Sequence, residues 1–404
     1  MSSRVYRMAD SQLPAVLAAL AASGSTARTT ETWAQDAMTA LVLGDDHAID
    51  ALMPLARRDL RVGAGPTADQ PRVLKAGWLS ANQFASRMGL RRQTRSSAGQ
   101  WAEMLPDVEA LFAMLRDTGA MLVQRWYQHV GFHPVLSVRC LYLDMLEAPP
   151  TAASRYHVQV LSIAEAEALQ PQMLDVHHDV FANAGGMVLR HPTFWHKALT
   201  HHFYREHYQF QIVALLSGQS LMGYAVIGWS GWHSKRPRMD VLEIATRQWD
   251  QSVAHELILT TSQLAWSKNV HQVRAVISAH DPYRGHLGRL GFKDLWGYSL
   301  LAKWLHPQKF IDRALHDVHV AAQIAVPGRV PLKLGATPAA GATAAELHTD
   351  EATLTKLLLN RIELPVALAD GSIKHAAALS SRQASELSAA LPYTPWVFHM
   401  LDYI

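Results

Sequence analysis

The sequence is poor in several features that mark whole classes of protein. It has one cysteine, Cys140, in 404 residues, which excludes a disulfide framework within the chain and a cysteine-based zinc site. The formal net charge is only +3, so the composition does not predict a general basic face for nucleic acid. No apolar run approaches the roughly twenty residues of a membrane-spanning helix. The N-terminal segment also lacks the apolar core of a signal peptide, and we expect a soluble, cytoplasmic protein.

Histidine is plentiful, with 22 residues, but its arrangement does not predict a metal centre. His177 and His178 are neighbours, as are His201 and His202, and neighbouring side chains on a helix point in different directions. The chain contains no H-E-x-x-H motif and no cluster of cysteine with histidine. We therefore expect no metal site.

The length of the chain predicts two or three domains, because 404 residues exceed one ordinary core. Hydrophobic residues make up 49% of the chain, enough to fold without disulfides or a metal. The segment "EAPPTAAS", residues 147–154, has the composition of a linker. A region rich in proline, glycine and alanine follows about residue 305. We therefore predict domains at 1–146, 155–304 and 305–404.

Two stretches of the chain repeat one order of elements. Each opens with a strand and a helix, at 5–22 and 156–181, and each closes on Gly-Phe, in "YQHVGF" (127–132) and "HLGRLGF" (286–292). In the first stretch we predict strands at 47–62, 72–86, 120–126 and 135–146, a basic loop at 87–99 and a helix at 100–119. In the second we predict a hairpin at 209–229 with the turn "SGQS", a strand at 238–247, a helix at 252–269 and a strand at 270–279. The repeat indicates two copies of one fold unit.

The last part of the chain is predicted to end in packed structure. "TDEATLTKLLLNRI", residues 349–362, has the pattern of a helix that begins with Thr349 or Asp350 as its N-cap. The chain stops on "PYTPWVFHMLDYI", residues 392–404, which is unusually apolar and aromatic. A loose terminus is usually polar, so we expect this one to be packed.

A strand, a basic loop, a helix, a strand and then "YQHVGF" resembles the core of the GNAT family of acetyl-CoA-dependent N-acetyltransferases. The whole chain is similar to the Eis type, the enhanced intracellular survival acetyltransferases; "LSGQSLMGYAVI" and "VLEIATR" resemble their central domain. The resemblance implies an α/β (α+β) fold class, with tandem GNAT domains of mixed sheets and a smaller sterol-carrier-protein-like C-terminal domain. It also implies acetyl-CoA as acyl donor, a small-molecule amine such as an aminoglycoside-like polyamine as acceptor, and a homohexamer.

The basic loop is the candidate site for the pyrophosphate of CoA. Arginine side chains and the free N–H groups at a helix start both bind phosphate. In the family the loop reads R/Q-x-x-G-x-G/A, and serine replaces its first glycine here; a register that starts at Arg95 is also open. The alternative is a solvated loop, or one paired with acidic residues. The candidate residues are Arg91, Arg92, Gln93, Thr94, Arg95, Ser96 and Ser97. The resemblance adds backbone contacts to pantetheine from the preceding strand, at Asn82, Gln83 and Phe84.

Tyr127 stands at the family position of the general acid that protonates the CoA thiolate. A phenol, with an ordinary pKa near 10, is protonated at neutral pH and can donate. The alternative is that Tyr127 only packs beneath the Gly-Phe turn. The second copy has Leu287 at the matching place, which cannot donate, so we predict that the second copy is scaffold. The resemblance implies that the terminal carboxylate of Ile404 is the base, and Asp402 is the alternative.

Two other functions fit part of this pattern. Ser96 and Ser97 in place of glycine suggest a GNAT-fold protein that binds a ligand or partner without catalysis. Aminoacyl transfer of the Fem type also pairs two GNAT-like units in a chain of this size. That family usually inserts a coiled-coil arm, and the sequence has no sustained heptads.

Overall fold

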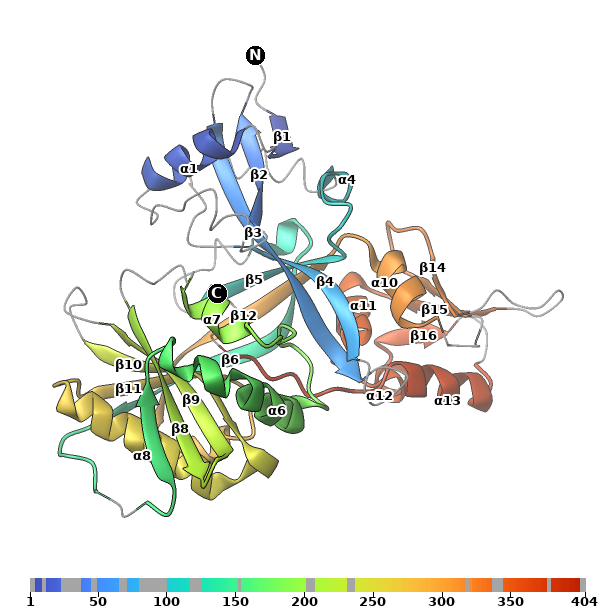
Figure 1. Ribbon diagram of the computed structural model, residues 1–404. Helices are drawn as coiled ribbons and strands as arrows, with labels where there is room; N and C mark the ends of the chain where they lie inside the picture. Colours follow the sequence, from blue (N-terminus) through green and yellow to red (C-terminus); the bar gives the residue numbers. More distant parts are fainter. Residues whose placement is uncertain are drawn as a thin grey trace. The chain divides into compact units, whose positions relative to one another are not determined.

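The structure is a computed structural model of the chain (Figure 1). It describes residues 4–8, 12–22, 38–44, 49–64, 71–79, 100–116, 125, 127–151, 154–200, 208–230, 237–316, 320, 322–335, 344–375 and 379–399. The chain divides into two compact units. Unit 1 combines Met1–Leu136 with Ser299–Pro395, and unit 2 combines Ser137–Tyr298 with Trp396–Ile404. Both units are therefore built from segments that lie far apart in the sequence.

The N-terminal part of unit 1 is a mixed sheet in the order β1-β2-β3-β4-β5. The first four strands run antiparallel to their neighbours, whereas β4 and β5 are parallel. The elements are β1 (Arg4–Arg7), α1 (Leu13–Ala22), β2 (Met38–Gly44), β3 (Ile49–Ala64), β4 (Pro71–Leu79), α4 (Trp101–Met104) and β5 (Ala110–Arg116). The strand and helix predicted within 5–22 and the extended segments predicted from residue 47 are confirmed.

The helix predicted for 100–119 is wrong. Only Trp101–Met104 are helical, and Ala110–Arg116 form strand β5, which pairs with β4. Pro106 follows the helix and lacks the N–H that a longer helix would need. Residues 110–115 are all buried, as is usual for a strand in a parallel pair, and an apolar run of this kind mimics a buried helix. Of the strand predicted at 120–126, only Arg125 is described, and it is helical.

The C-terminal part of unit 1 has a second, four-stranded sheet in the order β14-β13-β15-β16. Asp350 caps α11 by accepting from the backbone N–H of Thr353 at 2.7 Å, which decides between the two predicted caps. The predicted helix there is confirmed. The elements are α10 (Pro307–Ala314), β13 (Ala322–Ala325), β14 (Leu332–Leu334), β15 (Ala345–Thr349), α11 (Glu351–Leu358), α12 (Leu364–Ala369), β16 (Ile373–His375) and α13 (Ser381–Ala390).

An ion pair joins α10 to the N-terminal sheet within unit 1. Arg313 donates to both carboxylate oxygens of Glu109, at 2.8 and 2.6 Å from Nη2, and Glu109 is buried. Glu109 also accepts from the backbone N–H of Lys75 on β4, at 2.8 Å. The segment after residue 305 is thus held directly by the first sheet. The division of the chain into domains at 1–146, 155–304 and 305–404 stays a prediction.

Unit 2 is a mixed sheet in the order β6-β11-β10-β9-β8-β7. The predicted hairpin is confirmed, with Gly218 and Gln219 between its strands, and so are the strand, helix and strand that follow it. The elements are β6 (His133–Asp144), β7 (His157–Leu161), α6 (Gln170–Phe181), α7 (Phe194–Thr200), β8 (Tyr208–Ser217), β9 (Ser220–Ser230), β10 (Arg238–Thr246), α8 (Gln251–Ser267), β11 (Gln272–Ser278), α9 (Arg284–Arg289) and β12 (Lys293–Trp304). Strands β6 and β12 contribute residues to both units.

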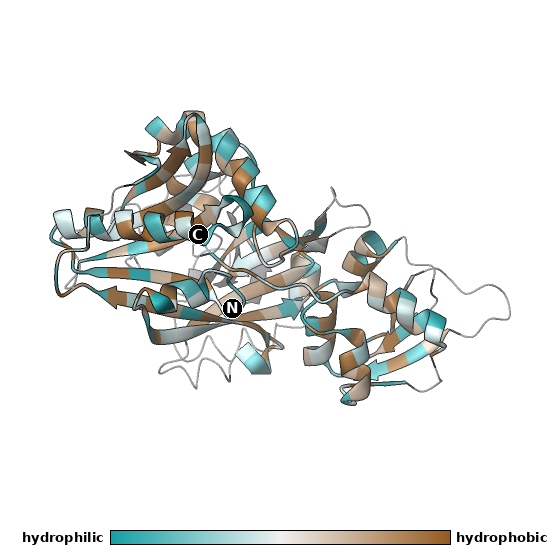
Figure 2. Cartoon of the chain, turned by 90° about the horizontal axis from the view of Figure 1, so that it is seen from below, coloured by the Kyte–Doolittle hydropathy of each residue, from teal (hydrophilic) through white to brown (hydrophobic). Residues whose placement is uncertain are grey.

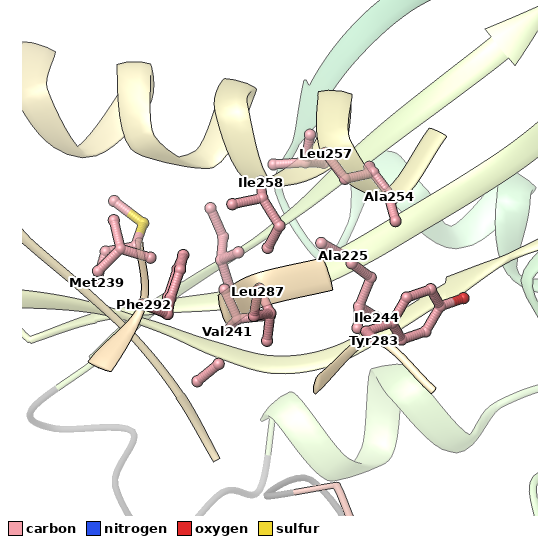
Figure 3. Packing of buried hydrophobic residues seen from close by; sticks show 14 of the residues in the cluster. Ala225, Met239, Val241, Ile244, Ala254, Leu257, Ile258, Tyr283, Leu287 and Phe292 are labelled. Atoms are coloured by element: carbon pink, nitrogen blue, oxygen red, sulfur yellow. The ribbon is translucent and has the colours of Figure 1, made fainter. Parts of the chain in front are cut away.

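The core of unit 2 lies between α8 and the sheet. Figure 3 shows Leu257 and Ile258 of α8 packed over Val241 and Ile244 of β10, with Leu287 of α9 beside them. All five are at most 5% exposed. Brown and teal segments alternate along the helices in Figure 2, as expected for helices that bury one side. Within the described part of the chain, no helix has the length and hydropathy to cross a membrane.

Both Gly-Phe sequences make the same turn. The N–H of Phe132 donates to the carbonyl of Tyr127 at 2.9 Å, and the N–H of Phe292 donates to the carbonyl of Leu287 at 3.1 Å. The glycines before them have φ of +86° and +90°, which side chains with a Cβ rarely adopt. This is the Schellman arrangement that ends many helices. Gly-Phe therefore forms the same helix-ending turn in both units.

Candidate functional site

An opening forms in the sheet of unit 2 where two parallel strands stop pairing. Strands β10 and β11 pair from Met239 with Val273 to Val241 with Ala275. Their registered pairs end there, although β10 continues to Thr246 and β11 to Ser278. A bulge in β10, next to β9, lies at the same point. Bulges bend a strand and often lie beside functional sites.

The C-terminal segment of the chain fills this opening. His399 forms a bridge with Ile277 of β11, and Trp396 forms one with Gly185. The hydroxyl of Ser278 donates to the carbonyl of Trp396 at 3.0 Å. Residues 396–399 are each at most 2% exposed. The packed terminus that the sequence predicts is confirmed for these residues.

The space that remains in the opening is small. The cavity has a volume of about 10 Å³, which is room for about one water molecule. Its polar lining is Glu243, Asp281 and His399, and apolar residues of β10, β11, α8 and α9 form the rest. Burial raises the pKa of the Asp281 carboxyl, whose Oδ2 meets no hydrogen-bond donor among the described residues. A cavity of this size does not admit a pantetheine arm.

Glu243 is the centre of a buried polar network beside the cavity. Its carboxylate accepts from a guanidinium N–H of Arg190, from the indole of Trp195 at 2.7 Å and from the hydroxyl of Tyr224 at 2.8 Å. Nδ1 of His399 lies 3.4 Å from Oε2 of the same carboxylate. The side chains of Arg190 and Glu243 are both 0% exposed. The sheet, the helices and the chain end therefore meet at one carboxylate.

The network fixes the protonation states of its members. Burial alone would raise the pKa of Glu243, but the Arg190 guanidinium and the hydrogen bond from His399 bring that pKa well below its usual range. Burial, with the positive charge of Arg190, lowers the pKa of His177 well below its usual range. Burial and the charge of Glu243 raise the pKa of Tyr224, which stays a donor. The network thus holds one ionised carboxylate opposite one guanidinium.

Three of these residues have the composition of a metal site. His177, Glu243 and His399 place one ligand atom each within 4.8 Å of one another. The imidazole Nε2 of His177 is buried without a hydrogen-bond partner in the described residues. However, Arg190 occupies Glu243 Oε2, and a divalent cation there would face a guanidinium at close range. The arrangement therefore favours a charged network that holds the C-terminal segment, and it does not favour a metal centre.

The N-terminus of α8 is also filled by the chain itself. Asp250 caps the helix and accepts from the backbone N–H of Ser252 at 2.8 Å and of Val253 at 3.3 Å. These N–H groups and the helix dipole would otherwise attract an anion such as pyrophosphate. A carboxylate in that position repels one. At this helix the Asp250 carboxylate therefore takes the place where an anion would bind.

Unit 1 repeats the parallel strand pair and keeps a tyrosine. Strands β4 and β5 pair from Ala76 with Ala110 to Trp78 with Phe112. Tyr127 is 4% exposed, and its ring packs edge-on against Phe132 with 5.1 Å between centroids. Burial raises the pKa of Tyr127 to about 12. The packing that we considered as an alternative is therefore present, and the role of Tyr127 as acid stays a prediction.

The other predicted site residues lie outside the described part of the chain. They are the strand residues Asn82 to Phe84, the loop residues Arg91 to Ser97, and Ile404. The sequence pattern did not reveal Glu243 or Arg190. The one signal for them was a glutamate inside the apolar strand "VLEIA", since a charge at such a position needs a buried partner.

Comparisons with known proteins identify the fold. No protein-family model and no curated protein matches the sequence. A GCN5-related N-acetyltransferase from Kribbella flavida matches with a TM-score of 0.60 at 15% identity, covering 100% of this chain and 99% of its own. One from Anabaena variabilis matches at 0.63 and 11%, covering 100% of both chains. A conserved Enterococcus faecalis protein of unknown function, described as a probable N-acyltransferase, matches at 0.67 and 11%, covering 99% and 98%. The predicted α/β GNAT fold is thus confirmed.

Replacing Glu243 tests the network. Glu243→Gln removes the carboxylate charge that faces the buried Arg190 guanidinium, so we expect the free energy of unfolding to fall by about 3–5 kcal/mol in urea titrations at pH 7. The control is Glu386→Gln in the exposed pair with Arg382, which should cost less than about 1 kcal/mol. Equal effects of the two substitutions would contradict the role of Glu243.

The same variant has a pH signature. A carboxyl whose pKa is lowered by folding stabilises the protein fully above its unfolded pKa, about 4.3, and this contribution is lost as the pH falls through the lowered folded value. The stability gap between wild type and Glu243→Gln should therefore be constant from about pH 7 to 5 and narrow below about pH 4. A gap that stays constant in acid would show that Glu243 is not ionised in the folded protein.

Proposed function

We propose that the protein is an N-acyltransferase that moves an acetyl group from acetyl-CoA to an amine of a small molecule. One contrast carries the proposal: the same Schellman turn follows Tyr127 in unit 1 and Leu287 in unit 2, so at this position the first copy offers a hydroxyl donor and the second does not. The full-length match to N-acetyltransferase structures supports the reaction class. The amine of an aminoglycoside-like polyamine or another polycation is the proposed acceptor.

The proposed reaction forms a C–N bond and breaks a C–S bond. The amine attacks the thioester carbonyl carbon, the CoA thiolate leaves, and the nitrogen gives its proton to a base. Tyr127, with its pKa raised to about 12, stays protonated and donates a hydrogen bond to the leaving sulfur. Full proton transfer to a thiolate of ordinary pKa, about 8.5, is uphill by about 5 kcal/mol. Tyr127 therefore acts by stabilising the developing negative charge on sulfur, and the released thiolate is then protonated by water, while the base returns the amine proton to solvent.

Acetyl-CoA binding is assigned to unit 1. The proposed pyrophosphate site is the loop from Arg91 to Ser97, and the proposed pantetheine contacts are the backbone of Asn82 to Phe84. The corresponding places in unit 2 hold the Asp250 cap and the C-terminal segment. One acetyl-CoA per chain follows.

The finer assignment is the Eis type. It comprises an N-terminal catalytic GNAT domain at 1–146, a central GNAT domain at 155–304, a sterol-carrier-like domain at 305–404 and a homohexamer. The base in this proposal is the carboxylate of Ile404, and Asp402 is the alternative. The ordinary pKa of a terminal carboxyl is about 3.5, so a water relay or burial must raise its basicity toward the amine.

Calorimetry with acetyl-CoA tests the function directly. We expect one acetyl-CoA per chain, and a large loss of affinity when Arg91, Arg92 and Arg95 are together changed to alanine, because phosphate contacts supply charge-assisted hydrogen bonds. Arg382→Ala, at an exposed arginine on α13, is the control for loss of a positive charge outside the loop, and it is compared with each single arginine-to-alanine change in the loop. Absence of binding would contradict the enzyme and favour a GNAT-fold protein without catalysis. Two bound molecules per chain would contradict the filled opening of unit 2.

Tyr127→Phe tests the donor. Because the hydroxyl acts on the leaving sulfur, we expect kcat to fall about 100-fold while the Kd for acetyl-CoA stays unchanged. Leu287→Met at the matching place in unit 2 should alter neither. Unchanged turnover in Tyr127→Phe would refute the donor role. In wild type, ionisation of Tyr127 should cause no loss of kcat up to about pH 10, because its pKa is about 12.

Extending the chain past Ile404 tests the base. A few added residues move the terminal carboxylate, so we expect kcat to be suppressed while acetyl-CoA still binds. An extension of equal length before Met1 is the control. Full activity in the C-terminally extended protein would remove Ile404 as the base and leave Asp402 as the candidate.

A further inference from the structure

The C-terminal segment Trp396–His399 contacts unit 2 in the way a bound peptide contacts a sheet. Peptides that add to a sheet gain affinity from main-chain hydrogen bonds and specificity from pockets for individual side chains. Here the N–H of Val397 donates to the carbonyl of Gly185 at 3.0 Å, and Ser278 donates to the carbonyl of Trp396. The bridge of His399 with Ile277 lies on β11, at the edge left open beside β10. The main chain of the segment therefore completes an unpaired edge.

Trp396 enters a notch that only glycine allows. Its side chain is 0% exposed. A Cβ on Gly186 would lie 2.9 Å from the indole ring and 3.0 Å from the carbonyl oxygen of Val397, and Gly186 also has a φ of +86°. The notch thus selects a large flat side chain at this position of the segment.

His399 enters a pocket that the rest of unit 2 builds. The Glu243 carboxylate accepts hydrogen bonds from Arg190, Trp195 and Tyr224, and none of these residues belongs to the segment. The ring of His399 also packs edge-on against Phe181, with 4.9 Å between centroids. The carboxylate is therefore already oriented before an imidazole arrives. A preformed pocket lowers the entropic cost of binding.

We propose that the opening between β10 and β11 is a peptide-binding site, and that its ligand is this chain's own segment 396–399, which binds as a separable element. Recognition rests on an aromatic side chain at Trp396 and an imidazole at His399, three positions apart. The proposal does not rest on the acyl-transfer reaction, but removal of the segment would also remove Ile404, the proposed base. It assigns the opening in the second copy of the fold to a peptide from the chain end.

Cleavage of the folded protein tests whether the segment is a ligand. A protease recognition sequence is inserted between Pro395 and Trp396, and the folded chain is cut there. We expect the segment 396–404 to remain bound through gel filtration and to exchange with an excess of labelled synthetic peptide of the same sequence. Loss of the segment on the column, with no binding of labelled peptide at about 1 mM to a protein that remains folded, would overturn the proposal.

Matched variants identify the two pockets. A peptide with His399→Ala should bind the cut protein at least about tenfold more weakly, because it loses the contact with the Glu243 carboxylate and the ring packing on Phe181. Gly186→Ala in the protein should weaken the wild-type peptide to at least the same extent, since the indole and the added methyl overlap. A peptide of the same composition in scrambled order is the control. Equal binding of all peptides would overturn the assignment of the pockets.

A second arrangement covers the case in which the insertion prevents folding. In the uncut chain with His399→Ala, the chain's own segment is weakened, so labelled wild-type peptide should displace it and bind. The uncut wild-type chain should bind at least about tenfold less peptide under the same conditions, because its own segment competes at high effective concentration. Failure of the peptide to bind the His399→Ala chain would count against an exchangeable segment.

Discussion

The ionised carboxylate of Glu243 is the constraint on which unit 2 depends. A charge that is 0% exposed is tolerated only with a counter-charge and with its lone pairs satisfied. Arg190 supplies the counter-charge, Trp195 and Tyr224 donate hydrogen bonds to the lone pairs, and His399 lies beside Oε2. These groups come from different elements, so satisfying one carboxylate orients all of them. Apolar packing tolerates small displacements, whereas these directional bonds do not.

The two units share elements of one fold, and in unit 2 the chain itself satisfies backbone groups of those elements. Both end a helix in the same Schellman turn, and both contain a parallel pair of strands. In unit 2 the N–H groups at the start of α8 are satisfied by Asp250, and the open edge of β11 is satisfied by the chain end. In unit 2 the chain's own atoms therefore satisfy the helix N–H groups and the strand edge. The residue before the shared turn also differs: it is Tyr127, which has a hydroxyl, in unit 1 and Leu287, which has none, in unit 2.

The sequence predicts those strands and helices whose own residues show a clear hydrophobic alternation or a clear cap. The hairpin of β8 and β9 alternates, and α11 begins at a clear cap, so both are found from local pattern. Strand β5 is buried on both faces and carries no alternation, which is why its sequence resembles that of a helix.

The candidate site divides in the same way. Tyr127 is found because it lies in a recognisable turn. The Glu243 network is not found, because it joins residues 190, 243 and 399, which no local pattern relates. The order of elements also reveals the duplication, but not that unit 1 takes in Ser299–Pro395 or that unit 2 takes in the chain end. Those associations depend on contacts such as Arg313 with Glu109, far apart in sequence.

The position of the segment Trp396–His399 in the chain decides when unit 2 can finish folding during synthesis. Domains usually fold as units during synthesis, starting from the N-terminus. Here unit 2 is interrupted after Tyr298 and receives its last strand-like segment only from residue 396 onward. Until residues 396–399 have been synthesised, the edge of β11 stays uncovered and Glu243 lacks His399. A chain that stops before Trp396 would therefore leave that edge exposed to other chains.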